Sequence, residues 1–256
     1  MSLLKTIMKY AAPAPKTESF ERYLFVGPHP DDIEIGAGAA AAKLAAMGKE
    51  VCFLVCTDGR FGYGSTDKRG DELVECRKSE AIASAKALGV SSVRFLDLSD
   101  GALYSVDDLK RGIASVIGEF KPDIIFCPDP DVDSECHSDH LNVGRACKEI
   151  AFFAHFGEIM AEKYAAESAP VSAVAFYFTA KPNRYIDTSG YLKKQLDTIF
   201  SNHISQFPAG SSDGKMIRTY LKLKAYDYGV RNFCRTAEGF RVLGEVNMHC
   251  LPECGN

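Results

Sequence analysis

Short apolar runs alternate with longer helical patterns along most of the chain. Four runs have the length and the β-branched or aromatic character of strands: 23–27, 51–57, 92–96 and 123–127. Between them, apolar residues recur every three or four positions and predict three helices: 33–47, 71–88 and 106–120. Strands that alternate with helices of this length form a parallel sheet with right-handed crossovers. The pattern therefore predicts a three-layer α/β fold, with a mostly parallel sheet and helices on both faces.

The second half of the chain continues the pattern less regularly. Its predicted elements are a helix at 141–154, a strand at 171–179, helices at 191–206 and 215–233, and a closing segment at 236–246. Near the start, the Pro- and Ala-rich stretch 11–15 cannot continue a helix. We therefore predict a lead-in segment at 1–20 and a single domain at 21–256.

One imidazole and two adjacent carboxylates occupy the turn between the first predicted strand and its helix. The turn reads Pro28-His29-Pro30-Asp31-Asp32. It lies at the carboxyl end of a strand, where open α/β sheets bind their ligands. The aspartates could simply cap the helix, but one would suffice, and His29 would have no explanation. The alternative is a metal site in which His29 and Asp32 face one cation and leave Asp31 free beside it.

A second cluster of ionisable residues follows the fourth predicted strand. Residues 128–140 hold five carboxylates and two histidines, His137 and His140, which are three positions apart. The carboxyl ends of parallel strands share one edge of a sheet, so we expect this cluster beside the first. A solvated acidic loop with a helix cap would explain most of the carboxylates, but not two histidines at metal-ligand spacing. We predict a metal held by His29, Asp32 and one of these two histidines.

Two histidines and one carboxylate leave a coordination position open for water, as in catalytic rather than structural zinc sites. Zinc lowers the pKa of such a water to about 7. Asp31, which is not committed to the metal, could take the proton of the water. The remaining histidine could stabilise an oxyanion or protonate a leaving amine. These parts together predict metal-assisted hydrolysis of an amide, with zinc as the expected metal and iron(II) as an alternative that suits the same ligands.

An arginine interrupts the apolar face of the predicted helix 71–88. Arg77 falls among the apolar positions of this helix, which are 73, 74, 81, 82, 85 and 88. It could extend out of the core edge into water, or it could be buried and directed at a polar ligand. The Gly-rich loop 58–65 before the helix is typical of loops that carry binding residues, and it favours the ligand interpretation.

Composition argues against several classes of partner. The 256 residues carry a net charge of −4, whereas binding to nucleic acid or to a membrane surface needs a basic surface. No apolar run is long enough to span a membrane, and none resembles the core of a signal peptide. The nine cysteines show no CxxC pair, and Cys52, Cys56 and Cys127 fall in apolar strand-like runs where we expect them buried. We therefore expect a cytoplasmic protein with a small-molecule partner; a homo-oligomer is compatible with the sequence.

The motifs together resemble those of the LmbE-like N-deacetylase family, which includes the GlcNAc-phosphatidylinositol de-N-acetylases. The resemblance covers about 24 to 245, most of the chain. The residues that carry it are His29-Pro30-Asp31-Asp32, Arg77 and Glu80, Asp100-Gly101, His137-Ser138-Asp139-His140, Lys194, His203, Gln206 and Ala237-Glu238-Gly239-Phe240.

The resemblance implies a Rossmann-like fold and the zinc-dependent removal of an acetyl group from an N-acetylated amino sugar or its conjugate. The zinc ligands that it implies are His29, Asp32 and His140. It further implies that Asp31 is the general base and that His137 is the electrostatic or acid partner.

Two residues are predicted to bind the substrate: Arg77, by the resemblance and by its place on an apolar face, and Asp100. Two alternatives to deacetylation remain. One is an amidase that cleaves a larger acyl group with the same site. The other is a sugar- or nucleotide-binding protein that keeps a metal only structurally, and this alternative gives Asp31 no role.

Overall fold

A seven-stranded sheet forms the centre of the computed structural model, which describes residues 3–249, 251 and 253. The strands are β1 (Arg22–Gly27), β2 (Glu50–Thr57), β3 (Ser92–Leu98), β4 (Ile124–Pro128), β5 (Ala173–Tyr177), β6 (Arg184–Asp187) and β7 (Ala237–Gly244). Their order in the sheet is β3-β2-β1-β4-β5-β7-β6, and the first five run parallel. The predicted mostly parallel sheet is confirmed. Residues 1–2, at the start of the predicted lead-in, and residues 254–256, at the end of the predicted domain, lie outside the residues that the structure describes.

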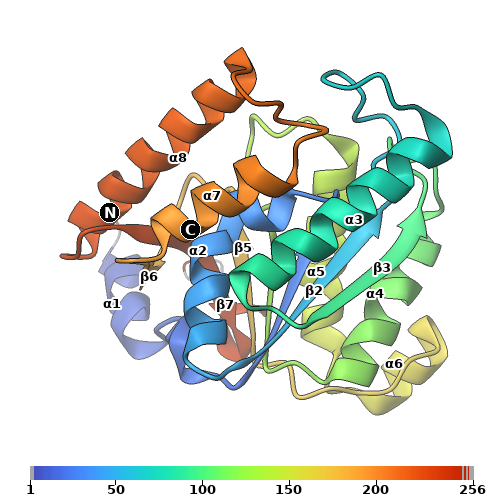
Figure 1. Cartoon of the computed structure of the whole chain (residues 1–256). Helices are drawn as coiled ribbons and strands as arrows, with labels where there is room; N and C mark the ends of the chain where they lie inside the picture. The colour runs from blue at the N-terminus through green and yellow to red at the C-terminus, as the bar shows by residue number, and fades with distance from the viewer. Residues whose placement is uncertain (1–2, 250, 252, 254–256) are drawn as a thin grey trace.

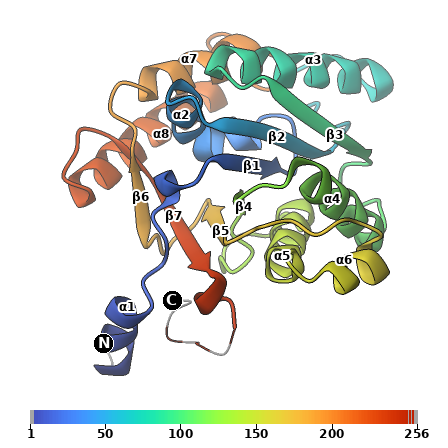
Figure 2. The same cartoon turned by 90° about the horizontal axis from the view of Figure 1, so that it is seen from below.

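Helices cover both faces of the sheet (Figures 1 and 2). On one face lie α2 (Asp32–Ala46), α3 (Gly70–Leu88) and α7 (Leu192–Asn202), with α8 (Ser212–Arg231) packed beside α7 and β7. On the other face lie α4 (Val106–Phe120), α5 (Ser138–Phe153) and α6 (Gly157–Tyr164). The remaining elements are α1 (Leu3–Ala11) and two short 3₁₀ helices, η1 (Thr17–Ser19) and η2 (Glu245–Asn247). The three predicted layers are therefore present.

Alternation along the strands divides the core between the two faces. In β1, Leu24 and Val26 pack toward α4 and α5, whereas Tyr23 and Phe25 pack toward α2 and α3. Successive side chains of a strand point to opposite faces, so a strand covered on both sides must be apolar throughout. The same rule explains the expected burial of Cys52, Cys56 and Cys127, which is confirmed on the α4–α5 face.

Four elements of the fold go beyond the predicted pattern. Strand β7 runs antiparallel to both β5 and β6, and β6 is a four-residue strand at the sheet edge. Helix α6 has only eight residues, and α1 lies within the segment predicted as a lead-in. Such short elements contain too few residues for a periodic apolar pattern to be recognised. The direction of a strand leaves no local signal in the sequence.

The sheet topology brings the two ionisable clusters together. Strand β1 lies between β2 and β4, with Phe25 beside both Phe53 and Phe126. The chain leaves β1 toward a helix on one face and leaves β4 toward a helix on the other. This is the switch point at which α/β sheets bind ligands, and residues 28–32 and 129–140 both follow it.

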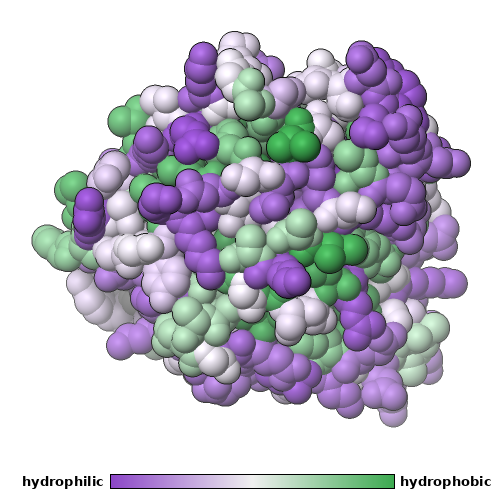
Figure 3. Space-filling view, in the orientation of Figure 1, coloured by the Kyte–Doolittle hydropathy of each residue, from purple (hydrophilic) through white to green (hydrophobic). Residues whose placement is uncertain are grey.

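Hydrophilic residues cover much of the face seen in Figure 3, with apolar residues scattered between them. None of the helices in the part of the chain that the structure describes is long and apolar enough to cross a membrane.

Candidate active site

The two aspartates after β1 do not cap α2. Asp31 occupies the N-cap position with φ 152° and ψ −23°, and its side chain accepts no capping hydrogen bond. A positive φ is strained for a residue with a side chain and occurs mostly at functional sites. The Oδ2 atom of Asp32 instead accepts the backbone N–H of His29 at 2.9 Å. The capping explanation of this pair is therefore excluded.

His29, Asp32 and His140 converge at the carboxyl edge of the sheet. The Nδ1 atom of His29 lies 3.0 Å from Oδ2 of Asp32, and Nε2 of His140 lies 3.4 Å from the same oxygen. One donor atom from each residue falls within 4.8 Å of the others, so these three residues could hold a metal ion. They come from the β1–α2 turn and from the first turn of α5, as the sequence predicted.

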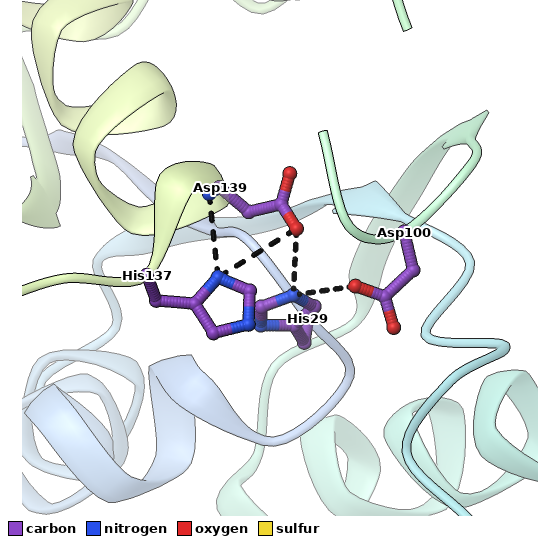
Figure 4. A group of neighbouring side chains, drawn as sticks. All are labelled: His29, Asp100, His137 and Asp139. Carbon is purple, nitrogen blue, oxygen red and sulfur yellow. Dashed lines mark hydrogen bonds and ion pairs between the residues drawn. The ribbon is translucent and has the colours of Figure 1, made fainter. Parts of the chain in front are cut away.

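The second nitrogen of His29 faces two further carboxylates (Figure 4). Its Nε2 atom lies 3.1 Å from Oδ1 of Asp100 and 3.3 Å from Oδ2 of Asp139. Together with His137, these residues form a second group that could hold a metal. However, the oxygens of Asp139 already accept the backbone N–H groups of Gly101 and Ala102, both at 2.9 Å. We therefore interpret Asp100 and Asp139 as residues that orient His29, a common arrangement behind metal-binding histidines.

The predicted substrate residue Asp100 is 5% exposed. Besides His29, its carboxylate accepts the backbone N–H of Phe61 at 3.2 Å and that of Gly101 at 2.6 Å. Its role toward a substrate stays a prediction.

Negative charge dominates the electrostatics of the site. Burial lowers the pKa of His29, but hydrogen bonds to Asp100, Asp139 and Asp32 outweigh it and raise this pKa to about 12. Burial raises the pKa of Asp139 and that of Asp100, yet the hydrogen bonds from His29 hold both below their usual range. The cluster therefore favours a cation strongly, and its nitrogen and oxygen donors suit a divalent metal.

Arg77 lies against Asp31, with a separation of 3.3 Å between Nη2 and Oδ2. It also donates to the carbonyl oxygens of Gly59 and Pro30, at 2.9 and 3.2 Å. Burial raises the pKa of Asp31 to about 6, although Arg77 opposes the shift. Arg77 is only 3% exposed, so the structure bears out its expected burial on an apolar face. Its predicted contact with substrate stays a prediction.

His137 is the N-cap residue of α5. Its Nδ1 atom accepts the backbone N–H of Asp139 at 3.3 Å, which leaves the proton of the neutral ring on Nε2. Its ring lies edge-on to that of His29, with 4.7 Å between the centroids. The side chain is 47% exposed, so it can reach a bound molecule.

Besides Asp139, two residues with close contacts in the site had no role assigned from the sequence. Glu135 places Oε2 at 3.0 Å from Nδ1 of His140, although the pattern indicates only a solvated acidic loop. His203, which belonged to the family resemblance without a role, is fully buried with Nε2 3.2 Å from Oε1 of Glu34. The only signal for Glu135 is its place two residues before His137.

Comparison with known proteins agrees with this geometry. The family model described as PIG-L, GlcNAc-PI de-N-acetylase, matches residues 24–151. Diacetylchitobiose deacetylase of Thermococcus kodakarensis is 33% identical over 234 residues, which are 91% of this chain and 86% of the relative. The 1D-myo-inositol 2-acetamido-2-deoxy-alpha-D-glucopyranoside deacetylase of Thermomonospora curvata is 30% identical over 238 residues, which are 82% of this chain and 77% of the relative.

A solved structure is similar over almost the whole chain. It is that of N,N'-diacetylchitobiose deacetylase from Pyrococcus horikoshii in complex with its inhibitor MPG. The TM-score is 0.84 at 30% identity, covering 98% of this chain and 93% of the other. The fold and the site thus define a protein of the deacetylase class, whose members hydrolyse N-acetyl amides. The chain belongs to the PIG-L family, the LmbE-like deacetylases that its motifs resemble.

Proposed function

We propose that the protein is a zinc-dependent deacetylase that removes the acetyl group from an N-acetylated amino sugar or its conjugate. The observation that carries this proposal is Asp31, a strained and buried carboxylate that lies beside the metal-ligand set without belonging to it. A metal kept only for structure would need no such neighbour. The names of the relatives support an N-acetylglucosamine-containing substrate. The proposal takes 21–256 as one catalytic domain, preceded by a lead-in at 1–20.

His29, Asp32 and His140 would hold the metal in this proposal. Two imidazoles and a carboxylate match the ligands of catalytic zinc sites, and iron(II) would suit them as well. Zinc at such a site lowers the pKa of water to about 7 and polarises a carbonyl oxygen. The negative charge of Asp32, Asp100 and Asp139 around His29 supports a cation at this place.

Asp31 would act as the general base. Its pKa of about 6 leaves it ionised at neutral pH and still basic enough to take a proton from the attacking water. As the C–N bond breaks, that proton goes to the leaving amine. Arg77 would hold the carboxylate of Asp31 in place through their 3.3 Å contact.

His137 would stabilise the charge that develops on the carbonyl oxygen. Because its Nδ1 accepts the N–H of Asp139, its Nε2 carries the proton and can donate to that oxygen. Arg77 and Asp100 stay the predicted contacts to the sugar.

The test is the release of acetate from N,N'-diacetylchitobiose and from N-acetylglucosamine conjugates by the zinc-loaded protein. We expect acetate to be released. A chelator should abolish the release, and added zinc should restore it. The substitution Asp31→Asn should lower the release strongly. A panel of larger N-acyl amines, followed by free amine, separates deacetylation from wider amidase activity. If the zinc-loaded protein releases acetate from none of the acetylated sugars, the proposal is wrong.

A further inference from the structure

A single carboxylate contacts both histidines that follow β4. Oε2 of Glu135 lies 3.0 Å from Nδ1 of His140, and Oε1 accepts the backbone N–H of His137 at 2.7 Å. The Glu135 side chain is 23% exposed, so it is held against the protein rather than solvated.

The contact settles which nitrogen of His140 is free to bind. Nε2 faces Asp32 at 3.4 Å, whereas Nδ1 faces Glu135. A histidine that binds a metal through one nitrogen must carry its proton on the other, and a carboxylate at that proton fixes the tautomer and the ring orientation. The ring also stacks on Phe178, with 5.9 Å between the centroids and 10° between the planes.

The other acidic residues of this loop have different surroundings. Asp129 is buried and pairs through both oxygens with Arg241, at 2.5 and 2.9 Å. Asp131 binds Lys148 and Arg241, and Asp133 is exposed. A turn in which the N–H of Glu135 donates to the carbonyl of Val132 at 3.0 Å directs Glu135 back toward the histidines.

We propose that Glu135 is a positioning residue of the metal site. Its carboxylate holds the proton of His140 on Nδ1 and so keeps Nε2 directed at the metal position. The same carboxylate fixes the backbone of His137 by accepting its N–H. This role rests on the metal site of the proposed function but not on any particular substrate.

The test measures zinc affinity rather than activity. Metal-free protein is titrated with zinc in competition with a chromophoric chelator, for the wild type, Glu135→Ala, Glu135→Gln and the loop control Asp133→Asn. We expect Glu135→Ala to weaken zinc binding about 10- to 100-fold. Glu135→Gln can still accept the Nδ1 proton without a charge and should lose less, and Asp133→Asn should stay within about twofold of the wild type. If Glu135→Ala does not fold, Glu135→Gln decides.

The outcomes separate this role from the site on which it rests. If the wild type binds zinc and Asp32→Asn does not, the proposed ligand set is supported. Wild-type affinity in both Glu135 variants would then overturn the positioning role alone. An equal loss in Asp133→Asn would also overturn it, because the effect would belong to the charge of the loop. If the wild type binds no zinc, the ligand set itself is wrong and the role of Glu135 falls with it.

Discussion

Asp31 has a strained backbone, its side chain is buried, and it is not one of the three proposed metal ligands. Its φ of 152° directs the carboxylate away from the helix N-terminus, which Asp is otherwise suited to cap. The neighbouring Asp32 faces His29 and His140 instead. The backbone of one turn therefore directs two adjacent residues of identical chemistry toward different partners, Asp31 toward Arg77 and Asp32 toward the two histidines.

The first prediction concerns the pH dependence of activity. Burial raises the pKa of Asp31 to about 6, and a base must be ionised to act. A cation beside Asp31 would lower this pKa, so in the zinc-loaded protein we expect kcat/KM to be level above about pH 6 and to fall only below it. The measured value belongs to Asp31 together with the groups coupled to it. The check is kcat/KM from pH 5 to 8 at saturating zinc. An acidic limb that persists unchanged in the residual activity of Asp31→Asn contradicts the assignment.

The second prediction concerns Arg77. Replacing it by Ala removes the guanidinium 3.3 Å from Asp31 and should lower kcat/KM while leaving the zinc content near that of the wild type. Arg94→Ala is a suitable control, because Arg94 is exposed and its ion-pair partner, Glu119, belongs to neither cluster. Steady-state kinetics and elemental analysis on the same samples provide the check. If Arg77→Ala loses activity only because it unfolds, Arg77 is a structural partner and not part of the site.

At the scale of elements, the Gly-rich loop before α3 covers Arg77 closely. A Cβ atom on Gly59 or on Gly62 would lie 2.4 Å from Nη1 of Arg77, much closer than real contacts allow. Gly64, two residues further on, has open space around its Cβ position. A side chain at Gly59 or at Gly62 would therefore displace the guanidinium of Arg77.

The third prediction uses this contrast. Gly62→Ala should displace Arg77, and with it Asp31, and lower kcat/KM by about tenfold or more, because small displacements in a catalytic site are costly. Gly64→Ala should leave kcat/KM near the wild-type value. Thermal unfolding of both variants shows whether the difference arises from stability. Equal activity of the two variants is the result that would argue against the close packing described here.

Helix α2, which begins at Asp32, has a break inside it, and a carboxylate from near the other end of the chain binds the backbone there. Ala37 has non-helical angles of φ −151° and ψ 17°. At this break the carboxylate of Glu238 accepts the backbone N–H groups of Ala39 and Ala40, at 3.2 and 2.7 Å. Gln195 donates to Glu238 at 2.9 Å and to the carbonyl of Glu34 at 2.8 Å, which links the break to the turn that carries Asp32.

The fourth prediction follows from the burial of Glu238. Burial raises its pKa from the usual 4.5 to about 7, against the opposing hydrogen bonds from Ala40 and Ala39. The folded state therefore holds the proton more tightly than the unfolded state. This contribution to stability is complete below pH 4.5 and is lost as the pH rises through about 7. Glu238→Gln cannot titrate. Between pH 5 and pH 8 its free energy of unfolding should therefore fall by about 1–3 kcal/mol less than that of the wild type.

Urea unfolding of the metal-free wild type and Glu238→Gln at the two pH values tests this difference. Identical pH dependence of the two proteins would show that folding does not raise the pKa of Glu238.

The break in α2 also shows where local pattern stops predicting structure. Residues 36–42 are glycines and alanines, a pattern that does not fix where the helix breaks, and the carboxylate that binds the backbone at the break is about 200 positions away. Helix α4 was predicted with its observed bounds, Val106–Phe120, because its apolar stripe is regular, and in the structure Ser105 caps it. Periodic elements are thus readable from sequence, and departures imposed by distant side chains are not.

At the scale of the whole molecule, the site is assembled from segments more than 100 residues apart. The pairing of β1 with β4 places the ends of these strands side by side, so that His29 and His140 meet. The sequence sufficed to predict this meeting, because two compact motifs each followed a strand of a parallel sheet. It did not suffice for Glu135 or Asp139, since the path of a loop decides which of several carboxylates reaches which imidazole.

The most direct test of the account compares Asp31→Asn with Asp32→Asn by zinc content per chain and acetate release, measured on the same purified samples. Asp32→Asn should be depleted of zinc, since a neutral amide is a poor ligand. Asp31→Asn should keep about one zinc per chain and turn over about 10² to 10⁴ times more slowly than the wild type, the loss expected for a general base. If Asp31→Asn loses its zinc or keeps nearly full activity, Asp31 is not the base and the proposed mechanism is wrong.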